Sequence, residues 1–161
     1  MGQYHYLINL DKKQFIHPHE IGNGLKLKEQ IGWEYSTSTA LVMLLAASSR
    51  EGGRGGGDFR AEHPLIGAWS GNRIAFIGDY AESNDVPGFD APLIFKQCNA
   101  GCYPDLKDKT EGWKQWTDIS PQVREMMQAE FGIRYKGEGW LEIVGKGNPK
   151  LCPDLIITRS E

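Results

Sequence analysis

The fold is decided by the stretch YHYLINL at residues 4–10, in which side chains suited to two different faces alternate. Successive side chains of a β-strand point to opposite faces, so the even-numbered residues would share one face and the odd-numbered residues the other. A polar turn at 11–13 and the apolar pair Phe15-Ile16 follow, and Pro18 ends the second strand because proline cannot donate a ladder hydrogen bond. Residues 4–17 therefore predict a β-hairpin.

Three further segments carry helix signals. Asn23 can cap a short helix over 25–31. Residues 37–50 predict a helix that is apolar nearly all round over 40–47, which places it inside the core. Ser120 as cap and Pro121 in the first turn predict a helix over 120–131.

The remaining apolar segments are short and lie between turn residues, as strands do. The run 74–77 is apolar throughout and suits a central strand buried on both faces. Residues 81–118 give no clear assignment. The predicted strands are 65–69 and 73–80, joined as a hairpin by the turn 70–72, then 133–135 with 140–144, and finally 155–158.

These elements predict an α+β fold with a mostly antiparallel sheet of about five to seven strands and two or three helices, because short turns join antiparallel neighbours. The 161 residues suit one globular domain spanning 1–161. The segment 51–60, which holds five glycines, is expected to be a flexible loop within it.

Composition narrows the classes of function. A formal net charge of −3 argues against an extended nucleic-acid surface. The longest apolar run, 40–47, is too short to span a bilayer, and no signal peptide is visible. An odd number of cysteines fits poorly with a disulfide framework. We therefore expect a cytoplasmic protein without membrane contact. The sequence leaves open whether the protein forms an oligomer.

The glycine-rich segment is a candidate ligand-binding loop. Glycines let backbone N–H groups approach an anion, and the guanidinium groups of Arg54 and Arg60 suit phosphate or carboxylate. The Lys-Ser/Thr ending of a phosphate-binding loop is absent, so a simple linker is the alternative. Trp113 and Trp116, in a polar stretch, could anchor a partner or pack as a lid over the core.

The weak catalytic candidates are Asp79, His17 and His19. Asp79 follows the apolar strand 74–77, where a rigid element could aim its carboxylate. The pair His17-Pro18-His19 could bind a metal together with Cys98 and Cys102, but structural zinc sites usually contain two tight pairs. Local turns are the simpler interpretation. We predict no bound metal and no cofactor.

Several segments together resemble a family of small prokaryotic and phage-associated proteins without an established activity. They are MGQY at 1–4, NLDK at 9–12, HPH at 17–19, GNGLK at 22–26 and WSGNRI to GDY at 69–80. The resemblance implies a prokaryotic or phage accessory protein, and such proteins often bind host machinery. It assigns no catalytic residue.

The sequence favours a nonenzymatic binding protein whose ligand is a host protein or a small anionic molecule. The alternative is a small enzyme acting on a nucleotide or phosphorylated substrate through Asp79, His17 or His19 and the loop arginines. Geometry separates the two hypotheses. An enzyme needs these groups within reach of one pocket, whereas a binding protein needs an exposed surface.

Overall fold

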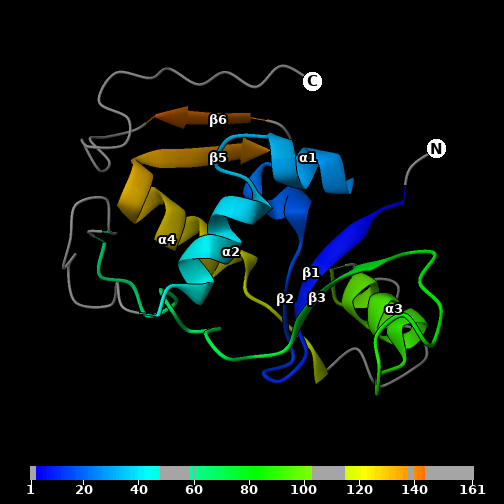
Figure 1. Cartoon of the computed structure of the whole chain (residues 1–161). Coiled ribbons are helices and arrows are strands. Elements are labelled where there is room, and N and C mark those ends of the chain that lie inside the picture. The colour runs from blue at the N-terminus through cyan, green and yellow to red at the C-terminus, as the bar shows by residue number, and fades with distance from the viewer. Residues whose placement is uncertain (1–2, 48–58, 60, 103–114, 138–139, 144–161) are drawn as a thin grey trace.

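In the computed structural model, the described residues form a four-stranded mixed sheet with helices on both faces and a separate two-stranded sheet (Figure 1). The fold is α+β, as predicted. The structure describes the backbone of residues 3–47, 59, 61–102, 115–137 and 140–143. Within these ranges it describes side chains for 3–47, 59, 61–99 and 115–133.

The main sheet has the strand order β3-β1-β2-β4. The hairpin of β1 (His5–Asn9) and β2 (Gln14–Ile16) is confirmed, and β1 also pairs antiparallel with β3 (Ile74–Gly78). The short β4 (Thr117–Asp118) runs parallel to β2, so the sheet is mixed. A sheet of five to seven strands is not confirmed.

Two further strands form the separate sheet. β5 (Ile133–Gly137) pairs antiparallel with β6 (Trp140–Ile143), close to the predicted ranges. The predicted strand 155–158 lies outside the described residues.

Alternation along β1 divides the core between the two faces of the sheet. Leu7 belongs to a cluster that includes side chains of α2 (Thr37–Leu45) and α4 (Ser120–Phe131). Tyr6 and Ile8 belong to a second cluster with side chains of α3 (Ala91–Cys102). The sheet therefore lies between helices, with α3 on one side and α2 and α4 on the other (Figure 1).

The helices confirm two predictions and correct a third. α1 (Leu27–Gly32) and α4 match the predicted segments. The predicted helix 37–50 was to be buried on all sides, but α2 ends at Leu45 and buries only one side. Met43 and Leu44 are buried, whereas Val42 is 62% exposed.

The predicted strand 65–69 is wrong, and so is the hairpin 65–80. These residues form turns that receive the C-terminal end of α2. The Gly67 N–H donates to the Met43 carbonyl and the Trp69 N–H to the Leu44 carbonyl, each at 2.9 Å. The Met43 carbonyl also accepts from the Ala46 N–H at 3.3 Å. Carbonyls at the C-terminal end of α2 thus take the N–H groups that a strand would have given to a sheet.

The strand 74–77 was predicted to lie at the centre of the sheet, but β3 lies at its edge. Its first three residues are half-buried. The sequence pattern suggested a central strand because all of its side chains are apolar. In the structure, the helices on both faces of the sheet give β3 its apolar surroundings at an edge position. The centre of the sheet is occupied by β1 and β2.

The helix α3 lies in the stretch 81–118 that the sequence left unassigned, so the described residues form four α-helices and not the predicted two or three. Asp90 precedes it, and its Oδ1 accepts a hydrogen bond from the Leu93 N–H at 3.2 Å. In the described part of the chain, no helix combines the length and the apolar character needed to cross a bilayer.

Candidate functional site

The catalytic candidates His17 and Asp79 lie at the same end of the sheet. β1 begins at His5, which pairs with Gly78 next to Asp79 on β3. β2 runs in the opposite direction and ends at Ile16, so His17 follows at this end as well. Two residues that sequence reasoning did not single out, His5 and Asp118, accompany them at or near the strand ends.

His17 is built into the local structure at this end. It is 4% exposed, and its Nδ1 accepts a hydrogen bond from the His19 N–H at 3.2 Å, which caps the 3-10 helix η1 (Pro18–Ile21). Its backbone N–H donates to the Ser120 Oγ at 2.9 Å. Its ring centroid lies 5.1 Å from that of Tyr6 and 5.4 Å from that of His19.

This hydrogen bond limits the chemistry of His17. A neutral imidazole has one protonated nitrogen, and here Nδ1 uses its lone pair, so Nε2 carries the proton. In this tautomer His17 can donate a hydrogen bond from Nε2 but has no spare lone pair with which to act as a general base. The geometry thus suits a structural cap better than a catalytic base.

Burial lowers the pKa of His17 from its ordinary value, because a charged imidazolium loses its hydration. The nearby His19 lowers the pKa further, while the carboxylates of Asp118 and Glu20 act in the opposite direction. Burial likewise lowers the pKa of His5, against the attraction of Asp79. Both rings therefore favour the neutral form at neutral pH.

Asp79 extends the pairing between β1 and β3. Its Oδ1 accepts from the Tyr4 N–H, and its own N–H donates to the Tyr4 carbonyl, both at 3.0 Å. The side chain is exposed. This arrangement is the local strand-closing role that a turn aspartate commonly has.

The proposed metal ligands are not gathered into a site within the described residues. No group of three or more His, Cys, Asp or Glu side chains there could hold a metal ion. Cys98 is a buried thiol in the α3 core cluster, and the side chain of Cys102 lies outside the described residues. The absence of a bound metal stays a prediction.

Of the four proposed ligand-binding residues, the structure describes one. Trp116 is half-buried against the α3 core cluster, and its Nε1 donates to the Gln97 Oε1 at 2.7 Å. Most of its surface is thus engaged within the chain. Arg54, Arg60 and Trp113 lie outside the described residues.

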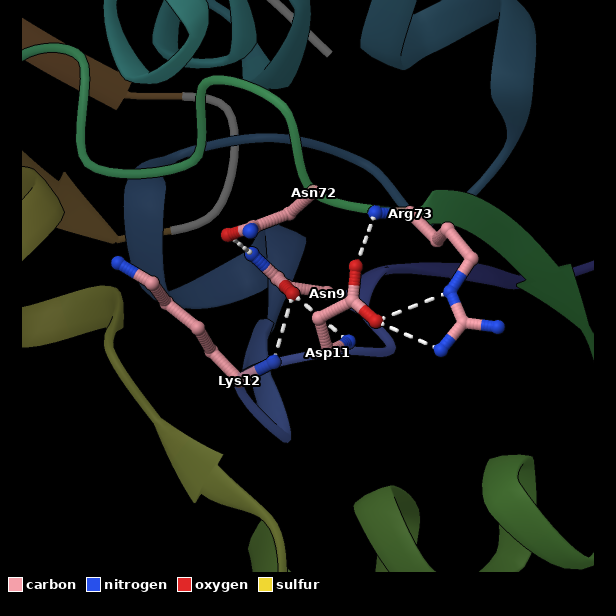
Figure 2. A network of polar contacts seen from close by, with 5 residues as sticks. All are labelled: Asn9, Asp11, Lys12, Asn72 and Arg73. Atoms are coloured by element: carbon pink, nitrogen blue, oxygen red, sulfur yellow. Dashed lines mark hydrogen bonds and ion pairs between the residues drawn. The ribbon is translucent and has the colours of Figure 1, made fainter.

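A polar network at the β1–β2 turn was also missed from the sequence (Figure 2). The buried Asn9 accepts from the N–H groups of Asp11 and Lys12 and donates to Asn72 at 2.9 Å. Asp11 accepts three hydrogen bonds from Arg73, and these lower the pKa of its carboxyl group. The network joins residues 9–12 to 72–73 and fixes the hairpin turn on the segment before β3.

The helices α1 and α2 each expose two aliphatic side chains. We call these four residues the α1–α2 aliphatic surface. The two helices contact each other. The exposed fractions are 37% for Leu27, 71% for Ile31, 62% for Val42 and 39% for Leu45. Sequence reasoning missed this surface because it placed 37–50 inside the core.

Comparisons with protein-family models, with curated proteins and with solved structures find no match for this chain. The resemblance to prokaryotic and phage-associated proteins therefore stays a prediction.

Proposed function

We propose that the protein is a nonenzymatic binding protein and that its partner is another protein. The proposal rests on the exposure of two aliphatic side chains on each of the contacting helices α1 and α2, which we propose act together as one surface. Exposing aliphatic side chains costs about 25 cal/mol for each Å² that could otherwise be buried. A protein partner that covers them would recover this free energy, and apolar positions on helices are common contact points.

The environment of the catalytic candidates also favours binding over catalysis. Asp79 bonds to the backbone of Tyr4, and the lone pair of His17 Nδ1 bonds to the backbone of His19. Both side chains thus have structural partners. An enzyme would instead aim its acid, base or nucleophile at a substrate.

A protein partner fits this surface better than a small anion does. The four side chains are aliphatic and offer neither a positive charge nor a hydrogen-bond donor. We propose Arg54, Arg60, Trp113 and Trp116 as additional contacts, since Arg and Trp are frequent at interface hot spots. A host protein as the partner follows from the phage-like resemblance by analogy.

Affinity capture from a prokaryotic lysate with the tagged full chain tests the proposal. The variant Ile31→Lys/Val42→Lys places two charges on the α1–α2 aliphatic surface. The matched control Gln122→Lys/Gln128→Lys makes the same charge change at two exposed positions of α4. All three proteins are compared by quantitative mass spectrometry and by melting temperature.

We expect the wild type and the α4 control to capture the same protein. The α1–α2 variant should recover about tenfold less of it while keeping its fold, because a buried unpaired lysine costs well over 1.4 kcal/mol. Equal recovery by all three proteins would contradict the proposal. A nucleotide that copurifies with the chain, with no protein partner, would favour the small-enzyme alternative.

A further inference from the structure

Among the residues that the structure describes, no strand pairs with the outer side of β3, so this edge can accept a further strand. The strand occupies one end of the order β3-β1-β2-β4, so only one of its sides is paired within the sheet. Its five residues, Ile74–Gly78, include no charged residue and no proline. Its register with β1 runs through five consecutive pairs without a bulge. Natural edge strands usually carry a charged side chain, a proline or a bulge, which prevents further pairing.

The hydrogen-bond pattern shows which backbone groups point outward. The Leu10 N–H donates to the Arg73 carbonyl and the Asp79 N–H donates to the Tyr4 carbonyl. The backbone N–H and C=O groups of residues 73 and 79 therefore point toward β1. Direction alternates along an antiparallel strand. The N–H and C=O groups of Ile74, Phe76 and Gly78 therefore point away from β1.

Most of these outward groups lack a backbone partner among the residues that the structure describes. The Gly78 carbonyl accepts from the Ala81 N–H at 3.1 Å. Within the described ranges, no backbone hydrogen bond outside the β1 ladder involves Ile74 or Phe76. Strand-forming apolar residues with unpaired backbone groups are the features of a pairing edge.

We propose that this edge pairs antiparallel with β3 of a second copy of this chain, in a register centred on Phe76. Phe76 then lies opposite the partner's Phe76, and Ile74 opposite the partner's Gly78. This is the register that pairs all three outward-pointing residues of both copies. The two sheets become one continuous eight-stranded sheet.

Charge complementarity selects the same register and the same kind of partner. Arg73 and Asp79 lie three residues before and after Phe76, so each Arg73 lies opposite the partner's Asp79. Both side chains are exposed. The Arg73 side chain points to the α3 face, where its guanidinium lies 5.0 Å from the ring centroid of Phe89. Side chains alternate between the two faces along a strand, so Asp79, six residues later, points to the same face. Asp11 uses only two of the five guanidinium N–H donors of Arg73.

Sedimentation equilibrium of the full chain over a concentration series tests this inference, which does not depend on the proposed function. The wild type should show a reversible monomer–dimer equilibrium. Asp79→Arg places like charges opposite each other at two symmetric positions. It should raise the dimer Kd by about tenfold or more, since close like charges across an interface are costly. The control Glu125→Arg makes the same charge change on α4, where the Glu125 side chain is 72% exposed, and should leave Kd unchanged.

Two further variants separate pairing from folding. Asp79→Asn keeps an oxygen that can accept from the Tyr4 N–H, so the fold should persist while Kd rises by a smaller factor. Ile74→Pro removes an outward N–H without removing a β1–β3 hydrogen bond, and it should abolish the dimer in a folded chain. Even a weak dimer with a Kd of about 0.1 mM would be half-formed near that concentration. A wild type that stays monomeric at about 0.1 mM would therefore overturn the inference. A dimer whose Kd responds equally to Asp79→Arg and Glu125→Arg would do so as well.

Discussion

The buried side chain of Asn9 stabilises the β1–β2 turn. It is fully buried and makes three hydrogen bonds, two of them to N–H groups in the β1–β2 turn (Figure 2). We predict that Asn9→Ala lowers the free energy of unfolding by about 1–3 kcal/mol, because the turn amides lose their acceptor. Urea denaturation followed by circular dichroism measures the change.

Asn72→Ala is the matched control for Asn9. It removes only the hydrogen bond between the two side chains. The expected loss is about 1 kcal/mol or less. A larger loss for Asn72→Ala than for Asn9→Ala would show that the turn does not depend on Asn9.

The buried His17 gives the stability of the protein a pH dependence. Its pKa in the folded chain lies below the ordinary value of 6.5, mainly because of burial. Between the two values the unfolded chain binds a proton that the folded chain does not, so the free energy of unfolding falls as the pH is lowered through this window. His5 acts in the same direction.

We predict that His17→Asn reduces this loss of stability on acidification. Asparagine keeps a side-chain acceptor for the His19 N–H but does not titrate. Urea midpoints measured from pH 7 to just above the carboxylate range, about pH 5, give the two slopes. Identical slopes for variant and wild type would show that His17 titrates normally in the folded chain.

At the residue scale, the sequence identified capping residues but not their partners. Asn23 was predicted to cap the helix over 25–31, yet its Oδ1 accepts from the N–H and hydroxyl of Thr37. Ser120 was predicted as a cap, yet its Oγ accepts from the His17 N–H. Residue type indicates an ability to accept hydrogen bonds, whereas the tertiary fold decides which donor comes within reach.

At the scale of elements, α2 provides a matched pair of substitutions. Leu44 is fully buried, whereas Val42 on the same helix is 62% exposed. We predict that Leu44→Asp abolishes soluble folding, because burying an unpaired carboxylate costs several kcal/mol of a total stability of about 5–15 kcal/mol. Val42→Asp should change the free energy of unfolding by only about 0.5 kcal/mol.

Solubility and thermal melting of the two variants check this prediction. A cooperative melting transition for Leu44→Asp would show that Leu44 is not in the core. Failure of both variants would mean that the aspartate disturbs α2 itself, whichever side of the helix carries it.

Elements with strong local signals were predictable and those defined by tertiary contacts were not. Gly132 ends α4 with a left-handed φ of 65°, a conformation that glycine adopts readily. The segment 65–69 resembles a strand, but its N–H groups bond to the end of α2. The helix α3 had a usable signal in Asp90 followed by Pro92, a cap and a first-turn proline, which the surrounding polar residues obscured.

At the scale of the whole molecule, alternation predicted the faces of the sheet but not the order of its strands. Tyr6 and Leu7 lie on opposite faces, as the pattern required. The edge position of β3 could not be read from its apolar composition, because a strand covered by helices on both faces has the same composition wherever it lies in the sheet. The α1–α2 aliphatic surface was hidden for the same reason, since an apolar helix can be buried or exposed.

Hydrogen exchange on the captured complex tests whether the protein binds its partner through α1 and α2. Amide exchange across the full chain is compared with and without the partner recovered in the capture experiment. The proposal predicts slower exchange in 27–45, the range that holds the α1–α2 aliphatic surface, and little change in α4. Protection confined to the sheet end around His17 and Asp79, with 27–45 unchanged, would contradict it.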